Sequence, residues 1–226
     1  MMSAQLQQPS DQATSTPSAR APDPPEPRGN SNGISYAPLV NRVAQSLSPY
    51  VRARSSSPVA WQLLDDEAVS RARSENKLIF LSIGFLASHH CHLAHLESFS
   101  DPTLATLLNT EFIPIIIDRE EHPNYDYIYM NYNESLNSVG GWPLNVFLTP
   151  ELEPVFSGTY WAPPAGTSSA SNEDETEEAA VAGKPLDWLT VVRKVHSSWK
   201  DEESRVREEA QQNCIETWLP STTLKT

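Results

Sequence analysis

A short segment that is rich in histidine and also holds a cysteine carries most of the reactive side chains of this sequence. Four of the six histidines and one of the two cysteines lie between Ser88 and His95. Ser88 precedes Cys91 by three positions, which is the spacing of a Cys-x-x-Cys dithiol with serine in place of the first thiol. Disulfide exchange needs one thiolate that attacks and a second thiol that resolves the mixed disulfide. Because a serine hydroxyl cannot form a disulfide, the segment predicts the loss of dithiol turnover.

The remaining thiol, Cys91, allows three interpretations. It can be a small buried side chain beneath the loop, because cysteine is among the most buried residue types. It can act as a single thiol that reacts with an external thiol such as glutathione. It can pair with Cys214 if the C-terminal part of the chain folds back within disulfide reach.

Ser88 has a simple structural role as the N-cap of the helix that we expect to begin at His89. Its hydroxyl can accept an amide hydrogen bond there and stabilise the first turn by about 1 kcal/mol. A nucleophilic Ser88 would need His92 as an oriented base, and no acidic residue is evidently placed to orient that imidazole.

The histidines also suggest a metal site. Cys91 and His95 share one face of the expected helix, and His89 and His92 share an adjacent face. A tetrahedral zinc site needs ligands from several directions, whereas one short helix presents at most two of them to a common point. A metal-binding module built on these four residues is therefore an alternative, and we predict no metal and no cofactor.

Composition argues against two classes of partner. The chain has 16 Lys and Arg against 29 Asp and Glu, a formal net charge of −13, which is unsuited to a nucleic-acid surface. No apolar run approaches the ~20 residues that span a bilayer. The N-terminus lacks the apolar core of a signal peptide, and its basic residues are sparse. We expect a cytoplasmic protein, with the mitochondrion as the alternative, that binds neither nucleic acid nor membrane.

Two segments are too polar to offset their ordering entropy by burial. Residues 1–40 are rich in Pro, Ser, Gln and Ala, which is typical of a disordered tail. Residues 165–185 carry five carboxylates and no aromatic residue, which indicates a flexible acidic insertion. We therefore predict one domain over residues 41–216 around that insertion, and a C-terminal tail at residues 217–226.

Helical and strand patterns alternate within this domain. The expected helices cover residues 65–77, 89–99, 101–110, 125–136 and 186–216, and the expected strands cover residues 78–83, 115–118, 144–148 and 155–160. This order predicts an α/β fold with a central mixed sheet flanked by helices. A helix that begins at Ser-x-x-Cys after a strand stands where the thioredoxin-like fold carries its active site.

Several further stretches match a known family. They are NRVAQSLSPY (41–50), SPVAW (57–61), ENKLIFLSIGF (75–85), DREEHPNYDYIYM (118–130), GGWPLNVFLTP (140–150) and SGTYWAPP (157–164). Together with the Ser88 segment they resemble the thioredoxin-like domain of the spermatogenesis-associated protein 20 family, also called the DUF255 or YyaL-type family. Members usually carry Cys-His-Trp-Cys-His where this chain has Ser-His-His-Cys-His at residues 88–92. The resemblance thus implies that Ser88 replaces the attacking cysteine.

The resemblance also implies a groove for an extended peptide or protein segment. It places a cis peptide bond between Trp142 and Pro143, facing the helix that begins after Ser88. That bond would expose the backbone of Trp142 for pairing, with His89 and His92 as a polar surround. We therefore predict a redox-derived peptide-binding module, with a monothiol oxidoreductase and a metal-binding module as alternatives. A simple tight turn is the other interpretation of this GGWP stretch.

Two expectations remain. The charged run that begins at Asp118 follows a strand, and we interpret it as a solvated or ion-paired loop, with a catalytic acid–base set as the alternative. Family members usually continue into a large helical toroid, whereas this sequence ends at Thr226. We expect a truncated member, a fragmentary gene model or a free-standing domain, and no carbohydrate-related activity transfers to it.

Overall fold

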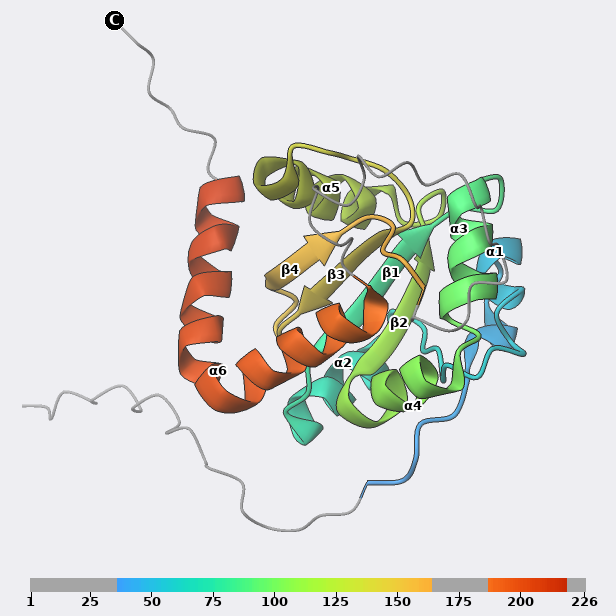
Figure 1. Ribbon diagram of the computed structural model, residues 1–226, viewed down its shortest axis with the longest axis horizontal. Coiled ribbons are helices and arrows are strands. Elements are labelled where there is room, and N and C mark those ends of the chain that lie inside the picture. The colour runs from blue at the N-terminus through green and yellow to red at the C-terminus, as the bar shows by residue number, and fades with distance from the viewer. Residues whose placement is uncertain (1–35, 164–186, 219–226) are drawn as a thin grey trace, which may run out of the picture. The chain divides into compact units, whose positions relative to one another are not determined.

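A four-stranded mixed sheet forms the centre of the computed structural model, which describes residues 36–163 and 187–218 (Figure 1). Its strands are β1 (Ile79–Gly84), β2 (Ile113–Asp118), β3 (Leu144–Leu148) and β4 (Pro154–Gly158), in the spatial order β2-β1-β3-β4. Strand β2 runs parallel to β1, whereas β3 is antiparallel to both β1 and β4. The predicted mixed sheet is confirmed.

Helices cover both faces of this sheet. They are α1 (Pro49–Arg52), α2 (Asp66–Glu75), α3 (His89–Leu93), α4 (Pro102–Glu111), α5 (Pro123–Asn137) and α6 (Trp188–Trp218). Alternate side chains of β1 point to opposite faces, as strand geometry requires. Ile79 and Leu81 pack with α2 and α5, whereas Phe80 packs with α1, α3, α4 and α6. The core is therefore divided by the sheet into two apolar layers.

Short polar side chains define where the helices begin. Asp65 accepts an amide hydrogen bond at 2.9 Å in the first turn of α2, and Asp101 accepts one at 2.8 Å in α4. Ser48 does the same for α1, at 3.2 Å. Such caps satisfy donors that the helix itself cannot pair. All five predicted helices are present, whereas α1 and the 3₁₀ turn Val43–Gln45 were not expected.

Strand β2 begins two residues earlier than the sequence predicts. Pro114 lies inside it and pairs in register with Phe80. A proline cannot donate to a ladder, but β2 is an edge strand, so the missing donor faces outward. Its carbonyl accepts a hydrogen bond from the amide of Gln62 at 2.8 Å.

Helix α6 bends at Glu202, whose backbone leaves the helical region (φ −138°, ψ 38°). Its first half crosses one face of the sheet, and its second half stands beside β4 (Figure 1). Before α6, a bridge joins Ala162 to Asp187, and the amide of Trp188 donates to the carbonyl of Ala162 at 3.1 Å. The two described segments of the chain thus meet at this bridge.

Several predicted segments lie wholly or partly outside the described residues. These are the N-terminal tail as far as residue 35, the acidic insertion, and the end of the chain from residue 219. Within the described remainder, the Tyr36 hydroxyl donates to the carbonyl of Ser74 at 2.7 Å. No helix in the described ranges is long and apolar enough to cross a membrane.

Candidate functional site

The start of α3 lies at the C-terminal end of β1, as the sequence predicts. The Ser88 hydroxyl accepts a hydrogen bond from the amide of Cys91 at 3.3 Å, which confirms Ser88 as the N-cap. Cys91 is only 3% exposed and belongs to the apolar layer beneath the helix. Both Cys91 and Cys214 are free thiols. The start of α3 therefore has the Ser88 hydroxyl as its cap and the Cys91 thiol buried beneath it.

The Cys91 thiol meets a tyrosine above Gly84. A Cβ atom built at position 84 would lie 2.3 Å from Tyr50 Oη and 2.7 Å from Cys91 Sγ, so only glycine leaves room for both. Burial, together with the adjacent Cys91, raises the pKa of Tyr50 far above its ordinary value. The guanidinium of Arg54, a residue only 7% exposed, lies 5.1 Å from the centroid of the Tyr50 ring. Cys91 is thus covered by α1 and sits among a neutral phenol and a nearby cation.

The four histidines of this segment differ in environment. His89, His90 and His92 are exposed, whereas His95 is half-buried, and its Nδ1 atom is buried without a hydrogen-bond partner. Burial, with smaller contributions from the Arg54 and His92 charges, lowers the pKa of His95 to about 4. His95 is therefore neutral at neutral pH, and His89 and His92 present imidazoles to solvent beside the helix start.

These histidines do not converge on one point. Among the described residues, no three or more His, Cys, Asp or Glu side chains are grouped so that they could hold a metal ion. The chemistry of a metal site needs such convergence. The metal-binding alternative therefore has no assembled ligand set in the described part of the chain.

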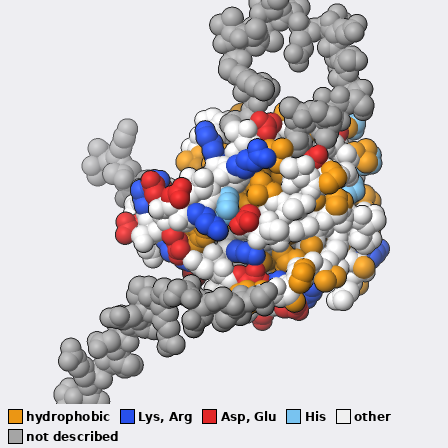
Figure 2. Space-filling view, turned by 60° about the horizontal axis from the view of Figure 1, so that its bottom comes forward, with side chains coloured by type: hydrophobic (Ala, Val, Ile, Leu, Met, Phe, Trp, Pro, Cys, Tyr) orange, Lys and Arg blue, Asp and Glu red, His pale blue; other side chains and the backbone are white. Residues whose placement is uncertain are grey.

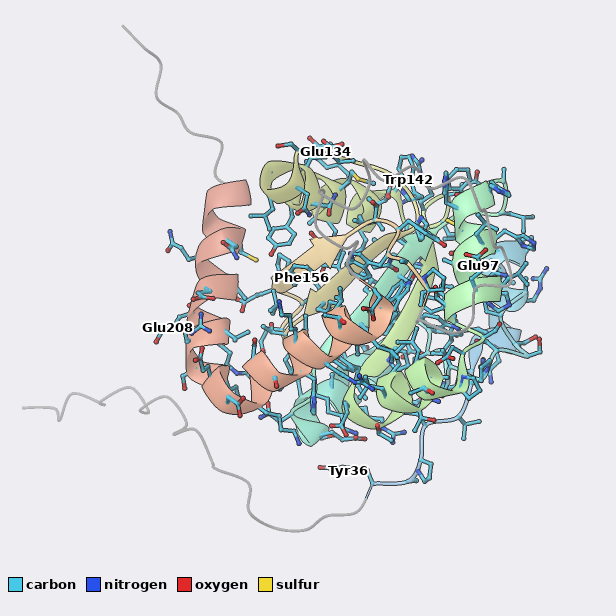
Figure 3. All side chains as sticks on the ribbon, in the orientation of Figure 1. Tyr36, Glu97, Glu134, Trp142, Phe156 and Glu208 are labelled. Carbon is cyan, nitrogen blue, oxygen red and sulfur yellow. The ribbon has the colours of Figure 1, made fainter. Side chains whose placement is uncertain are left out.

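The loop before β3 lies next to the loop after β1. The Trp142–Pro143 peptide bond is cis, as predicted. The rings of Phe85 and Trp142 meet edge to face, with centroids 5.8 Å apart and an interplanar angle of 84°. Trp142 is half-buried and lies at the same end of the sheet as the start of α3 (Figure 3). The two loops therefore form one continuous surface.

A buried carboxylate and an arginine hold this surface together. The Arg119 guanidinium stacks over Trp142, with its carbon 3.8 Å from the ring centroid, and lies 5.4 Å from the centroid of Phe85. Its Nε lies 3.2 Å from Asp126, which also accepts a 2.7 Å hydrogen bond from the Trp142 indole. The amide of Arg119 donates to the carbonyl of Gly84 at 2.9 Å. We call Phe85, Arg119, Asp126 and Trp142 the aromatic platform.

The backbone amide and carbonyl of Trp142 are available for hydrogen bonding on this platform. Within the described residues, neither its amide nor its carbonyl pairs with another backbone group. Buried backbone groups are nearly always paired, and Trp142 stands where solvent can reach it. Leu86, which follows Phe85 on the same loop, is 63% exposed. The platform thus offers aromatic, apolar and unpaired polar groups together.

The charged run after β2 is mainly structural. Asp118 is 4% exposed and accepts a hydrogen bond from the Ser48 hydroxyl at 2.6 Å and from the amide of Glu120 at 3.0 Å. The ion pair between Arg119 and Asp126 bears out the interpretation of this run as an ion-paired loop. No acid–base pair aimed at Cys91 or Ser88 is formed by these residues among the described contacts.

On its other side, α3 is tied to the end of β4. The Tyr160 hydroxyl donates to Glu97 at 2.6 Å, and burial together with this carboxylate raises the pKa of Tyr160 to about 12. The His90 ring contacts Tyr160 edge to face at 6.0 Å. Glu97 belongs to a π-helical turn, Ala94–Ser98, that continues α3 (Figure 3). These contacts therefore link α3 and the turn that continues it to the segment after β4.

Sequence reasoning missed four residues of this site: Tyr50, Arg54, Phe85 and Asp126. Tyr50 and Arg54 come from the four-residue helix α1 and the turn after it, which are too short to show a periodic pattern. Asp126 stands seven positions from Arg119 and sixteen from Trp142, so no local spacing links the three. The tryptophan beside proline was the one available signal, and it was recognised.

Comparison with known families agrees with this geometry. The family described as "Protein of unknown function, DUF255" matches residues 40–217, which is most of the chain. The chain belongs to the DUF255 family. It is a thioredoxin-like domain of the spermatogenesis-associated protein 20 type, as the motifs between residues 41 and 164 predict.

Curated relatives share this stretch within much longer chains. Human spermatogenesis-associated protein 20 is 33% identical over 198 residues, which cover 88% of this chain and 23% of the relative. The mouse protein of the same name is 40% identical over 161 residues, which cover 69% of this chain and 20% of the relative. The chain thus spans only about a fifth of the length of these DUF255 relatives.

Two solved structures are similar to part of this chain. A thioredoxin from Thermus thermophilus is 20% identical, with a TM-score of 0.35, over 43% of this chain and 74% of its own. A DsbH oxidoreductase is 13% identical, with a TM-score of 0.36, over 58% of this chain and 83% of its own.

Proposed function

We propose that this DUF255 domain binds an extended peptide or protein segment on the aromatic platform and does not turn over disulfides. The observation that carries the proposal is the position of the half-buried Trp142, stacked on Arg119 and Phe85, beside the start of α3. A peptide strand can hydrogen-bond to the backbone of Trp142 while a side chain of the peptide rests against the aromatic rings. Main-chain pairing of this kind supplies affinity, and side-chain pockets supply specificity.

The residues around Ser88 support a binding role over turnover. Dithiol exchange requires an accessible attacking thiolate, and position 88 offers a hydroxyl that caps the helix. The thiol of Cys91 is covered, at 3% exposure, by Tyr50 and the apolar layer. The same burial argues against a monothiol mechanism, because an external thiol such as glutathione must reach the sulfur. The exposed His89 and His92 supply a polar margin to the platform.

Panning of a library of random linear peptides without cysteine tests the proposal. Selected peptides should bind the chain with a micromolar dissociation constant, and replacement of the pairing amide by an N-methyl amide should abolish binding. Phe85→Ser should weaken binding about tenfold, since loss of one aromatic contact with a peptide costs about 1–2 kcal/mol. Tyr127→Ala is the matched control, because Tyr127 is an aromatic residue that is 69% exposed and lies outside the platform.

Reduction of insulin by dithiothreitol tests the absence of turnover. The chain should not accelerate the reaction above the rate without protein, and Cys91→Ala should behave in the same way. Acceleration that depends on Cys91 would contradict the proposal and favour a monothiol oxidoreductase. Peptides that bind equally well to the Phe85→Ser protein would show that the platform is not the binding surface.

A further inference from the structure

A cavity unrelated to the platform lies between β4 and the two halves of α6. Its volume is about 350 Å³, within the range of small-molecule sites, which begins at about 300 Å³. It exists because α6 bends at Glu202, so that both halves of the helix face the same strand. Phe156 projects from β4 into this space, on the side of the sheet that is next to α6 (Figure 3).

Most of the residues that line this cavity are apolar. The first half of α6 contributes Val191 and Val195, the second half contributes Val206 and Ala210, and β4 contributes Val155 with Phe156. These side chains offer no hydrogen bonds to a ligand. A buried polar group of a ligand that finds no partner among them costs about 1–3 kcal/mol. A hydrocarbon tail carries no such penalty.

The charged residues that line the cavity are Lys194, Arg205 and Glu209. Lys194 and Ser198 lie one turn apart on the exposed rim, and Lys194 has no ion pair within the described residues. Arg205, on the opposite rim, is already neutralised by Glu202 and Glu209. Lys194 is therefore the rim cation that remains available to an anion.

Further basic residues lie near Lys194 on the same half of α6. The first half of α6 carries Arg193, Lys194 and Lys200, and no acidic residue lies between Asp187 and Asp201. Lys200 lies 4.0 Å from Glu111, a residue of α4. Figure 2 shows Lys and Arg side chains around a histidine on one face of the molecule, with Asp and Glu side chains among them. On a chain with a net charge of −13, such a local excess of cations is a distinct feature.

We propose that this cavity binds an amphiphilic carboxylate, such as a medium-chain fatty acid. The alkyl tail lies between Phe156 of β4 and the valines of α6, and the carboxylate lies at the rim, where Lys194 and Ser198 can bind it. Burial of the tail supplies most of the affinity, at about 0.8 kcal/mol for each methylene group. The cation at the rim selects a carboxylate over a neutral or cationic head group of the same length.

Three probes with the same ten-carbon tail separate these contributions. Decanoate, decanol and decyltrimethylammonium are titrated into the full chain by calorimetry, below the concentrations at which they form micelles. Decanoate should bind most tightly and the cationic probe least tightly. Equal affinity for all three would overturn the proposal, since the charged rim would then play no part. Absence of decanoate binding would overturn it as well.

Two pairs of matched variants locate the bound molecule. Ser198→Trp places a bulky ring at the mouth of the cavity and should abolish decanoate binding, whereas Ser197→Trp, at an exposed neighbouring position outside the lining, should leave it unchanged. Lys194→Glu should weaken decanoate binding about fivefold and spare decanol, since one exposed ion pair contributes up to about 1 kcal/mol. Arg193→Glu changes the net charge equally and should have little effect. Equal losses within either pair would place decanoate elsewhere.

Discussion

The Arg119 guanidinium is held between the face of Trp142 at 3.8 Å and a carboxylate oxygen of Asp126 at 3.2 Å. Asp126 in turn accepts the indole hydrogen bond of Trp142, so the three side chains form a closed triangle. This triangle joins the loops that follow β2 and precede β3 to the start of α5. These contacts fix the orientation of the Trp142 indole ring, which is half-buried.

Replacement of Arg119 by glutamine should loosen this triangle. The cation–π contact contributes about 0.5–2 kcal/mol, and Asp126, only 6% exposed, would lose its charged partner. We expect the free energy of unfolding to fall by about 1–2 kcal/mol, measured by urea denaturation. Arg119→Lys keeps the charge but not the planar stacking, so it should restore only part of the loss. Full recovery with lysine would show that stacking contributes nothing.

Replacement of Gly84 by alanine should strain the contact between Tyr50 and Cys91. The new methyl group would lie 2.3 Å from the Tyr50 hydroxyl oxygen. Overpacking of this kind costs about 1–3 kcal/mol. The Tyr50→Phe background removes that oxygen, so Gly84→Ala should be less destabilising there, and a double-mutant cycle by urea denaturation measures the difference. Equal losses in both backgrounds would contradict the predicted clash.

Two substitutions at Ser88 separate its structural role from its redox role. Ser88→Ala removes the cap on α3 and should lower the free energy of unfolding by about 1 kcal/mol. Ser88→Cys restores the dithiol spacing with Cys91 and should allow insulin reduction if the rest of the site is competent. A disulfide between positions 88 and 91, detected by mass spectrometry after oxidation, checks that the new thiol reaches Cys91. No turnover despite that disulfide would show that more than one residue has been lost.

Acidification should destabilise the fold through His95. Burial lowers the pKa of His95 to about 4 from its ordinary value of 6.5, so the unfolded chain binds this proton more readily than the folded chain. The contribution of the neutral ring is fully present above pH 6.5 and is lost as the pH falls from about 6.5 to about 4. Urea denaturation across this window should show a steeper loss for the natural chain than for His95→Gln. A parallel loss in both proteins would assign the acid sensitivity to other groups.

The sequence alone predicted the elements and the helix starts because those depend on neighbouring residues. Ser88 and Asp101 could be recognised as caps because a cap acts on an amide three positions away. The buried strands showed as apolar runs between polar residues. Some bounds were misplaced by two residues: α5 begins earlier and β4 ends earlier than predicted. The start of β2 was misplaced because an edge strand accepts Pro114 where a central strand would not.

The contacts of the site depended on tertiary structure and could not be predicted in this way. Arg54 approaches Tyr50 and His95 only because α1 folds over α3, and no spacing in the sequence encodes that approach. The same holds for Asp126, which meets Trp142 across the end of the sheet. The cavity beside β4 depends on a bend at Glu202, a residue that is chemically ordinary for a helix.

The bridge between Ala162 and Asp187 has a practical consequence for engineering. Because the chain leaves β4 and enters α6 at adjacent points, the ends of any connection between them are already held together by a hydrogen bond of the main chain. Changing the length of such a connection adds little entropic cost, only about 0.6 kcal/mol for each doubling. This junction is therefore the place to insert a fluorescent reporter or an affinity tag while the platform and the cavity are left as they are.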